Sequence, residues 1–205
     1  LGAFSDDLAA IACFFTEVWT TPSTKLKGTL PIVLVGNAGF SLRALGRLRE
    51  ALEPMQAAVD LSAKQKNWEN AAASASNLSE LQLTLGEVAQ AGVSSQRSVG
   101  YADQSGELFL RMVSRTAHAD ALHQAGDTAA ALALFREAEQ LQQEWQPSYP
   151  RLYSLQGFQY CDLLLAQGST AEVLERTKYA LKISTEQLGL LDVALDQLTL
   201  GRAHL

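Results

Sequence analysis

Apolar and polar residues follow a helical period along most of the chain. In the segment 127–143, apolar residues recur three and four positions apart with charged residues between them, which is typical of an amphipathic helix. Other segments from residue 30 onward follow the same period. The pattern therefore predicts a run of about nine helices and no sheet. The apolar positions of the clearest segment are Ala131, Leu134, Phe135, Ala138 and Leu141.

Glycines divide this pattern at nearly regular intervals of 40, 40 and 42 residues. Each one follows a segment with a helical pattern, such as 67–85 or 107–125, and each precedes a second amphipathic segment. Glycine is typical of the position where a helix ends in a left-handed conformation. Each unit is therefore predicted to be a helix hairpin. The four glycines are Gly46, Gly86, Gly126 and Gly168.

The residues around these glycines repeat a second pattern, which concerns side-chain size. Small residues mostly stand seven positions before the turn and five and twelve positions after it, whereas the position nine after the turn varies in size. Small side chains let packed helices approach closely. Seven positions before the turn stand Gly39, Ser79, Ala119 and Cys161, and five after it stand Ala51, Ala91, Ala131 and Val173. Twelve after the turn stand Ala58, Ser98, Ala138 and Ala180, and nine after it stand Met55, Ser95, Phe135 and Thr177.

This order of small and large positions resembles the tetratricopeptide repeat, in which the position nine after the turn is a large aromatic. The match is best for 39–58 and 119–138 and covers about 30–205. Ser95 and Thr177 depart from the aromatic position, and the closing proline is absent. The period of 40–42 residues is similar to that of long repeats in bacterial signalling proteins and kinesin light chains. The resemblance implies an all-α fold, a right-handed superhelix (α-solenoid) of antiparallel helix hairpins.

The predicted organisation has two parts. Residues 1–29 are expected to hold the end of a truncated preceding repeat, with a capped helix at 5–19, followed by a loop. Residues 30–205 are expected to form a single structural unit of about four hairpins plus a terminal helix. The run Leu-Pro-Ile-Val-Leu-Val at 30–35 also has a strand-like composition. A helix start with Pro31 in its first turn is favoured, because nothing else in the chain offers a strand to pair with it.

Charge and composition narrow the class of partner. The chain has 205 residues, 47% of them hydrophobic, and a formal net charge of −6, so nucleic acid and anionic membrane are poor partners. No apolar run of about 18 residues and no secretion signal occur, which predicts a cytoplasmic protein. The two cysteines, Cys13 and Cys161, are not in a Cys-x-x-Cys pair and are predicted to be reduced, buried thiols.

The sequence offers no catalytic, cofactor or metal site. His118 and His123 are five positions apart on one predicted helix and so face different sides, whereas two ligands of one metal ion need a spacing of three or four. Neither a nucleophile elbow nor a phosphate-binding loop is present. Asn77 begins a glycosylation acceptor pattern, but it lies inside a predicted helix and is discounted. We therefore expect a protein without enzymatic activity.

The resemblance also implies which positions line a concave, partner-binding face. The residue six before the turn glycine is Phe40 in the first hairpin and an acid in the next three. These acids, Glu80, Asp120 and Asp162, would form a ladder suited to a basic segment of a partner. The alternative is that these acids form an ordinary solvated face. The full set of predicted binding residues is Phe40, Arg43, Ser76, Glu80, Thr116, Asp120, His123, Phe158 and Asp162, with Leu83 and Leu165 on the same wall.

Two functions are expected from this architecture. The first is a protein-interaction scaffold that binds a peptide or partner domain on its concave face, as a fragment of a larger regulatory protein. The alternative is a structural spacer or oligomerisation arm attached to an ATPase or effector domain. The apolar stripe of the terminal helix, at 190–195, would then support a homodimer. The irregular segment 145–150, rich in aromatic and proline residues, is either a rigid corner or the lip of a binding site.

Overall fold

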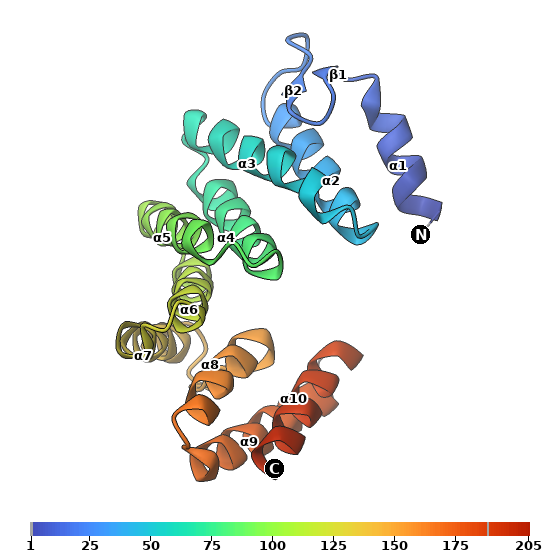
Figure 1. The fold of residues 1–205 in the computed structure, drawn as a ribbon. Helices are drawn as coiled ribbons and strands as arrows, with labels where there is room; N and C mark the ends of the chain where they lie inside the picture. Colours follow the sequence, from blue (N-terminus) through green and yellow to red (C-terminus); the bar gives the residue numbers. More distant parts are fainter. Residues whose placement is uncertain (1, 188) are drawn as a thin grey trace. The chain divides into compact units, whose positions relative to one another are not determined.

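The computed structural model describes residues 2–187 and 189–205 (Figure 1). This part of the chain divides into two compact units, unit 1 (1–107) and unit 2 (108–205). The single unit predicted for residues 30–205 stays a prediction. Unit 1 contains α1 (Gly2–Ala12), β1 (Phe15–Glu17), β2 (Thr21–Pro22), α2 (Leu30–Ala44), α3 (Leu48–Lys64), α4 (Trp68–Thr84) and α5 (Val88–Ser105). Unit 2 contains α6 (Leu108–Gln124), α7 (Thr128–Trp145), α8 (Ser154–Ala166), α9 (Thr170–Gln187) and α10 (Leu190–Ala203).

The predicted hairpins are present, and their turns lie at the predicted glycines. Helix α2 pairs with α3 and α4 with α5 in unit 1, while α6 pairs with α7 and α8 with α9 in unit 2. Asn67 and Asp127 cap α4 and α7, because each side chain accepts a hydrogen bond from a backbone N–H of the first turn. The turn glycines have left-handed φ angles of 76°, 79°, 88° and 74°, at Gly46, Gly86, Gly126 and Gly168.

The packing positions predicted from the repeat are buried in all four hairpins, whether they hold a small or a large residue. Where serine replaces alanine, its hydroxyl reaches the backbone of the neighbouring helix. Ser79 of α4 donates to the carbonyl oxygen of Ala91 at 2.9 Å, and Ser98 of α5 donates to that of Ala72 at 2.8 Å. These contacts require close helices, which the small side chains allow. The predicted register of the hairpins is therefore confirmed.

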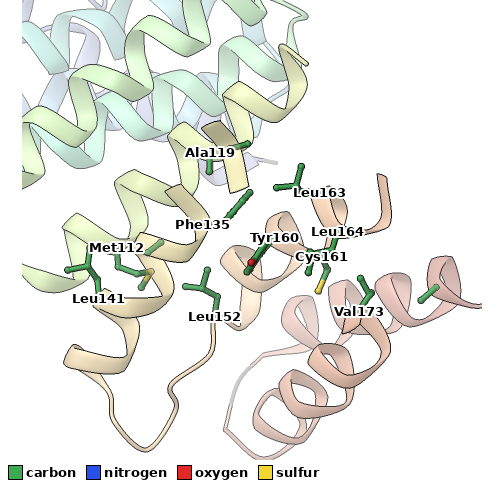
Figure 2. Packing of buried hydrophobic residues seen from close by; sticks show 13 residues of the cluster. Met112, Ala119, Phe135, Leu141, Leu152, Tyr160, Cys161, Leu163, Leu164 and Val173 are labelled. Atoms are coloured by element: carbon green, nitrogen blue, oxygen red, sulfur yellow. The ribbon is translucent and has the colours of Figure 1, made fainter. Parts of the chain in front are cut away.

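The core of unit 2 is built around Phe135, the large residue of the best-matched repeat (Figure 2). Its ring stacks on that of Tyr160 from α8, with centroids 4.8 Å apart and planes 9° from parallel. Met112, Leu141 and Leu152 extend the same cluster. In unit 1, a separate cluster of buried aliphatic side chains joins α2, α3 and α4.

The N-terminal prediction was wrong beyond residue 12. The helix expected to reach Trp19 ends at Ala12, and β1 and β2 then form a short antiparallel hairpin where a helix end and a loop were predicted. Aromatic and β-branched residues favour this local structure. The Phe15 ring packs edge-on against Trp19, and the Thr21 hydroxyl donates to the Glu17 carboxylate at 2.9 Å.

The choice of helix over strand at residues 30–35 is confirmed, because α2 begins at Leu30 with Pro31 in its first turn. The prediction for the cysteines holds for one of the two. Cys161 is buried, and burial raises the pKa of its thiol to about 11, whereas Cys13 is exposed because α1 ends just before it. No helix in the described part of the chain is both long and apolar enough to cross a membrane.

A buried carboxyl group lies between the last two helices. Asp196 of α10 is almost fully buried, and it accepts a hydrogen bond from the Ser184 hydroxyl of α9 at 2.5 Å. Burial raises the pKa of this carboxyl, the hydrogen bond from Ser184 lowers it and the charge of Asp192 raises it, with a net upward shift. The folded state therefore binds this proton more tightly than the unfolded chain does.

We expect Asp196→Asn to raise the thermal midpoint at pH 7, because the amide resembles the protonated acid and can donate to the Ser184 oxygen. The stability that comes from protonation is fully present below the unfolded pKa of about 3.9 and is lost as pH rises through the higher native pKa. The midpoint of the wild-type protein should thus approach that of the variant on acidification. Thermal unfolding from pH 7 to pH 4 measures this, with Asp7→Asn, an exposed acid of α1, as control. Parallel curves for wild type and D196N would contradict it.

Candidate functional site

Two predicted binding residues of unit 1 lie on one cavity. This cavity, the α2–α4 pocket, has a volume of about 180 Å³ and opens between α2, α3 and α4. Phe40 and Arg43 line it from α2. The other lining residues are Gly36, Met55, Ala58, Ser74 and Asn77.

Phe40 is the most prominent apolar group of this pocket. Its side chain is 63% exposed although it is large and aromatic, and its ring packs edge-on against Phe4 of α1 with centroids 5.8 Å apart. Leu30 and Val33 of the same helix are also exposed. Val33 follows Leu30 by three positions and Phe40 follows Val33 by seven, so the three side chains lie on one face of α2. The face therefore presents apolar surface that a partner could cover.

Glu80, the predicted acid of unit 1, already forms an ion pair. A guanidinium nitrogen of Arg43 donates to Glu80 of α4 at 3.1 Å, so two predicted binding residues join the first helices of successive hairpins. Both side chains remain partly exposed. The pair cancels most of the local charge, because each formal charge has its opposite within hydrogen-bond distance.

In unit 2 the predicted acids also contact side chains of neighbouring helices. The Nε2 atom of His123 from α6 lies 3.3 Å from Asp162 of α8, and Arg202 of α10 also donates to Asp162. Asp120 accepts a hydrogen bond from Gln159 of α8 at 3.3 Å. Burial is the main cause that raises the pKa of Asp120, and the neighbouring charge of Asp162 adds to the shift.

His123, Asp162 and Arg202 line a second, more open cavity of about 550 Å³, together with Leu165, Ala166, Thr170 and Leu205. Leu165 was predicted for this wall. The Nδ1 atom of His123 is buried and has no hydrogen-bond partner among the described residues. The acids of the predicted ladder in each unit thus serve as links between neighbouring helices.

Two predicted binding residues are not accessible. Ser76 and Thr116 are buried, and the Thr116 hydroxyl donates to the backbone carbonyl of Val113 at 2.8 Å. Phe158 is half-buried. The predicted residues that a partner can reach are therefore Phe40, Arg43 and Glu80 in unit 1 and Asp120, His123, Phe158 and Asp162 in unit 2.

Sequence reasoning missed two residues of these surfaces. Asn77 is exposed on the rim of the α2–α4 pocket, and no described side chain or backbone group is hydrogen-bonded to its amide. Its position three residues before Glu80, on the same helix face, could have revealed it. Arg202 follows Asp162 by 40 residues, which is one repeat, so the repeat period could have paired them.

Within residues 2–187 and 189–205, no group of three or more His, Cys, Asp or Glu side chains could hold a metal ion. The arrangement offers apolar surface, an amide and paired charges. These groups suit binding by contact and hydrogen bonding.

Comparisons with known proteins support the fold. No protein-family model matches the chain. No curated protein matches it either. Among solved structures, the chain is similar to the nearly identical TPR-like repeats of a Podosopora anserina protein described as a kinesin light chain, with 19% identity, a TM-score of 0.65 and coverage of 91% of this chain and 90% of that one. A variant of the same repeats with a single glutamine-to-methionine substitution gives 19% identity, a TM-score of 0.62 and coverage of 87% and 88%. The chain thus has the fold of TPR-like helical repeats.

Proposed function

We propose that this protein is a cytoplasmic interaction scaffold that binds an extended segment of a partner protein in the α2–α4 pocket. The observation that supports it most is the exposure of Phe40 beside a cavity on the predicted wall. The proposed activity is binding without catalysis, and it requires no cofactor or metal. Stacks of helix hairpins suit this role, because they offer an extended surface on which a peptide can lie.

The groups around the pocket define the contacts of such a segment. An apolar side chain of the partner would pack on Phe40 and Met55 and remove apolar surface from water. The amide of Asn77 can both donate to and accept from the main chain of an extended segment, because it carries an oxygen and an NH₂ group. Open space above Gly36, where a Cβ atom would meet no neighbour within 4 Å, leaves room for this backbone.

The paired acids affect the predicted preference for a basic segment. A lysine or arginine of the partner must compete with Arg43 for Glu80, and with Arg202 for Asp162. We therefore propose that contact with Phe40 supplies most of the affinity. The acids then supply a smaller part that weakens as salt increases.

We expect peptides selected from a random displayed library on the wild-type chain to bind Phe40→Ala at least ten-fold more weakly. Loss of a central aromatic contact commonly has an effect of this size. Fluorescence anisotropy with labelled peptides measures the dissociation constants. Val93→Ala is a matched control, because Val93 is 61% exposed in the same unit but lies on α5, outside the pocket.

Selected peptides that bind F40A and wild type equally would contradict the proposal. The oligomerisation arm would then be favoured, and one feature supports it specifically. Leu191 and Leu198 form an exposed apolar stripe on α10. Self-association in sedimentation experiments that Leu198→Glu abolishes would assign the homodimer to this helix.

A further inference from the structure

Unit 2 contains a further pocket, distinct from the His123 cavity and away from the predicted binding residues. It has a volume of about 270 Å³ and opens where α6 begins, α7 ends and the link 146–153 leads into α8. We call it the Trp145 pocket. It is lined by Phe109, Met112, Gln142, Trp145, Leu152, Tyr153, Ser154 and Gln156. Met112 and Leu152, labelled in Figure 2, also belong to the core of unit 2.

The rim of this pocket carries aromatic surface that the described residues of unit 2 leave partly uncovered. Phe109 is 44% exposed and Trp145 is 38% exposed, with their ring centroids 4.8 Å apart. Leu155, next to the lining residue Ser154, is also exposed. Large aromatic side chains left partly exposed around a cavity are characteristic of sites where a partner is anchored.

The walls of the pocket are held in place by hydrogen bonds. Gln142 is buried, and its amide nitrogen donates to the backbone carbonyl of Tyr149 at 2.8 Å and to the Gln146 side-chain oxygen at 3.1 Å. The Tyr153 hydroxyl donates to the same oxygen at 2.8 Å. The link is thereby fixed at both ends, so the cavity exists before any ligand arrives. A preformed site binds with a smaller loss of conformational freedom.

The backbone at the rim is also constrained. Ser154 has a φ of +55°, a left-handed conformation that is unfavourable for a residue with a side chain. Its hydroxyl donates to Asp192 of α10, which holds it there. A Cβ atom on Gly157 would meet the carbonyl oxygen of Leu152 at 2.8 Å, so the link lies directly against α8. The irregular segment is therefore a rigid corner and the wall of a pocket at once.

The chemistry of the lining defines the occupant. None of the lining residues is charged, so a charged group placed there would lose its hydration without gaining an oppositely charged lining residue. The volume lies just below the roughly 300–1,000 Å³ of pockets that hold whole small ligands. It therefore suits one side chain, and the exposed rim suits the residues that flank it in a partner.

We infer that the Trp145 pocket binds a single uncharged aromatic side chain presented by a segment of a partner protein. The side chain enters beside the contacting rings of Phe109 and Trp145 and reaches Met112. Its neighbours in the partner cover Leu155 and the exposed ring edges. Gln156 and Tyr153 remain at the rim, where they can bond to the polar backbone of that segment.

The two methionines of the chain provide a direct test, because Met112 lines this pocket and Met55 lines the α2–α4 pocket. The protein is labelled with ¹³C at the methionine methyl groups, and the two NMR signals are assigned with Met55→Leu and Met112→Leu. The probe is a capped heptapeptide with phenylalanine at its centre and glycine and serine around it. Matched peptides carry alanine or lysine at the centre.

We expect the phenylalanine peptide to shift the Met112 signal in a saturable manner, at least ten-fold more tightly than the alanine and lysine peptides. Trp145→Ala should weaken this binding at least ten-fold. Gln156→Glu should do the same, because it adds a charge at a half-buried rim position where a helix start tolerates an acid. Trp68→Ala, which removes an aromatic from the start of α4 in unit 1, should leave the Met112 response unchanged.

An unmoved Met112 signal at millimolar peptide, or equal shifts with all three peptides, would overturn the inference. So would undiminished binding to both W145A and Q156E. If N-acetylphenylalanine amide bound as tightly as the heptapeptide, the flanking residues would contribute nothing, and the pocket would be assigned to a free small molecule instead of a partner segment. These results do not depend on the proposed function. Binding in the α2–α4 pocket is followed separately by the Met55 signal.

Discussion

Phe135→Ala is expected to destabilise unit 2 by about 3–5 kcal/mol, the usual effect of removing a fully buried phenylalanine. The ring has no exposed surface, and it stacks on Tyr160, so its loss leaves a cavity between α7 and α8 and removes an aromatic contact (Figure 2). Alanine is compatible with a helical backbone, so the change in stability reports the loss of side-chain packing alone. Chemical and thermal unfolding, followed by the helical circular dichroism signal, measure the loss.

The same substitution at an exposed site provides the control for this effect. Phe40→Ala removes an equal number of atoms from α2, but most of that side chain is already in water. Its effect on stability should be within about 0.5 kcal/mol. Similar unfolding midpoints for F135A and F40A would mean that Phe135 is not the centre of the core.

Arg176→Gln is expected to be nearly as damaging, with a loss of about 3–5 kcal/mol. The guanidinium of Arg176 in α9 donates to both oxygens of Glu139 in α7 at 2.6 and 3.0 Å, and it lies 4.4 Å from the centroid of the Tyr160 ring. The two charged side chains are only 12% and 22% exposed. The substitution therefore leaves the largely covered Glu139 carboxylate without its counter-ion. Urea unfolding gives the change in stability.

A second ion pair with the same spacing serves as the matched control. Asp60 of α3 and Arg97 of α5 are also 37 residues apart and 3.0 Å from each other, but their side chains are more exposed. Arg97→Gln should cost only about 0.2–1 kcal/mol, as for exposed pairs in general. Adding Glu139→Gln to Arg176→Gln should restore part of the stability. Equal losses for R97Q and R176Q would show that burial does not determine the value of these pairs.

The repeat pattern predicted the hairpins well because it depends on backbone geometry and side-chain volume. Glycine at the turns and small residues at the packing positions act locally, so residues such as Gly126 and Ala131 could be placed by counting. Ser95 and Thr177 also fit, since their hydroxyls donate to carbonyl oxygens of their own helices and their volumes stay small.

The partners of charged side chains could not be predicted in the same manner. Counting identified Glu80 and Asp162 as equivalent positions of successive hairpins, but which cation meets them depends on side-chain conformations in a neighbouring helix. Burial at one position was also not predictable. Ser76 lies four residues before Glu80, so the two differ in direction by only about 40°, yet Ser76 is buried and Glu80 is partly exposed.

The N-terminal segment shows a further limit. Residues 13–22 lie outside the repeat, and no periodicity separated a helix from the short β-hairpin that forms there. The same reasoning accounts for Cys13, whose exposure follows from the early end of α1. The Trp145 pocket was foreseen only as one of two interpretations of an irregular link, because its walls come from three helices and from hydrogen bonds that no local pattern specifies.

The ion pairs between the second helices of successive hairpins limit how hairpins can be duplicated. In each unit the earlier second helix carries the acid and the later one carries the arginine: Asp60 with Arg97 in unit 1, and Glu139 with Arg176 in unit 2. Copying one hairpin would leave an acid or an arginine without its counterpart, whereas copying two together preserves every such pair. With respect to these two ion pairs, a block of two hairpins is therefore the smallest segment whose duplication keeps each acid with its arginine.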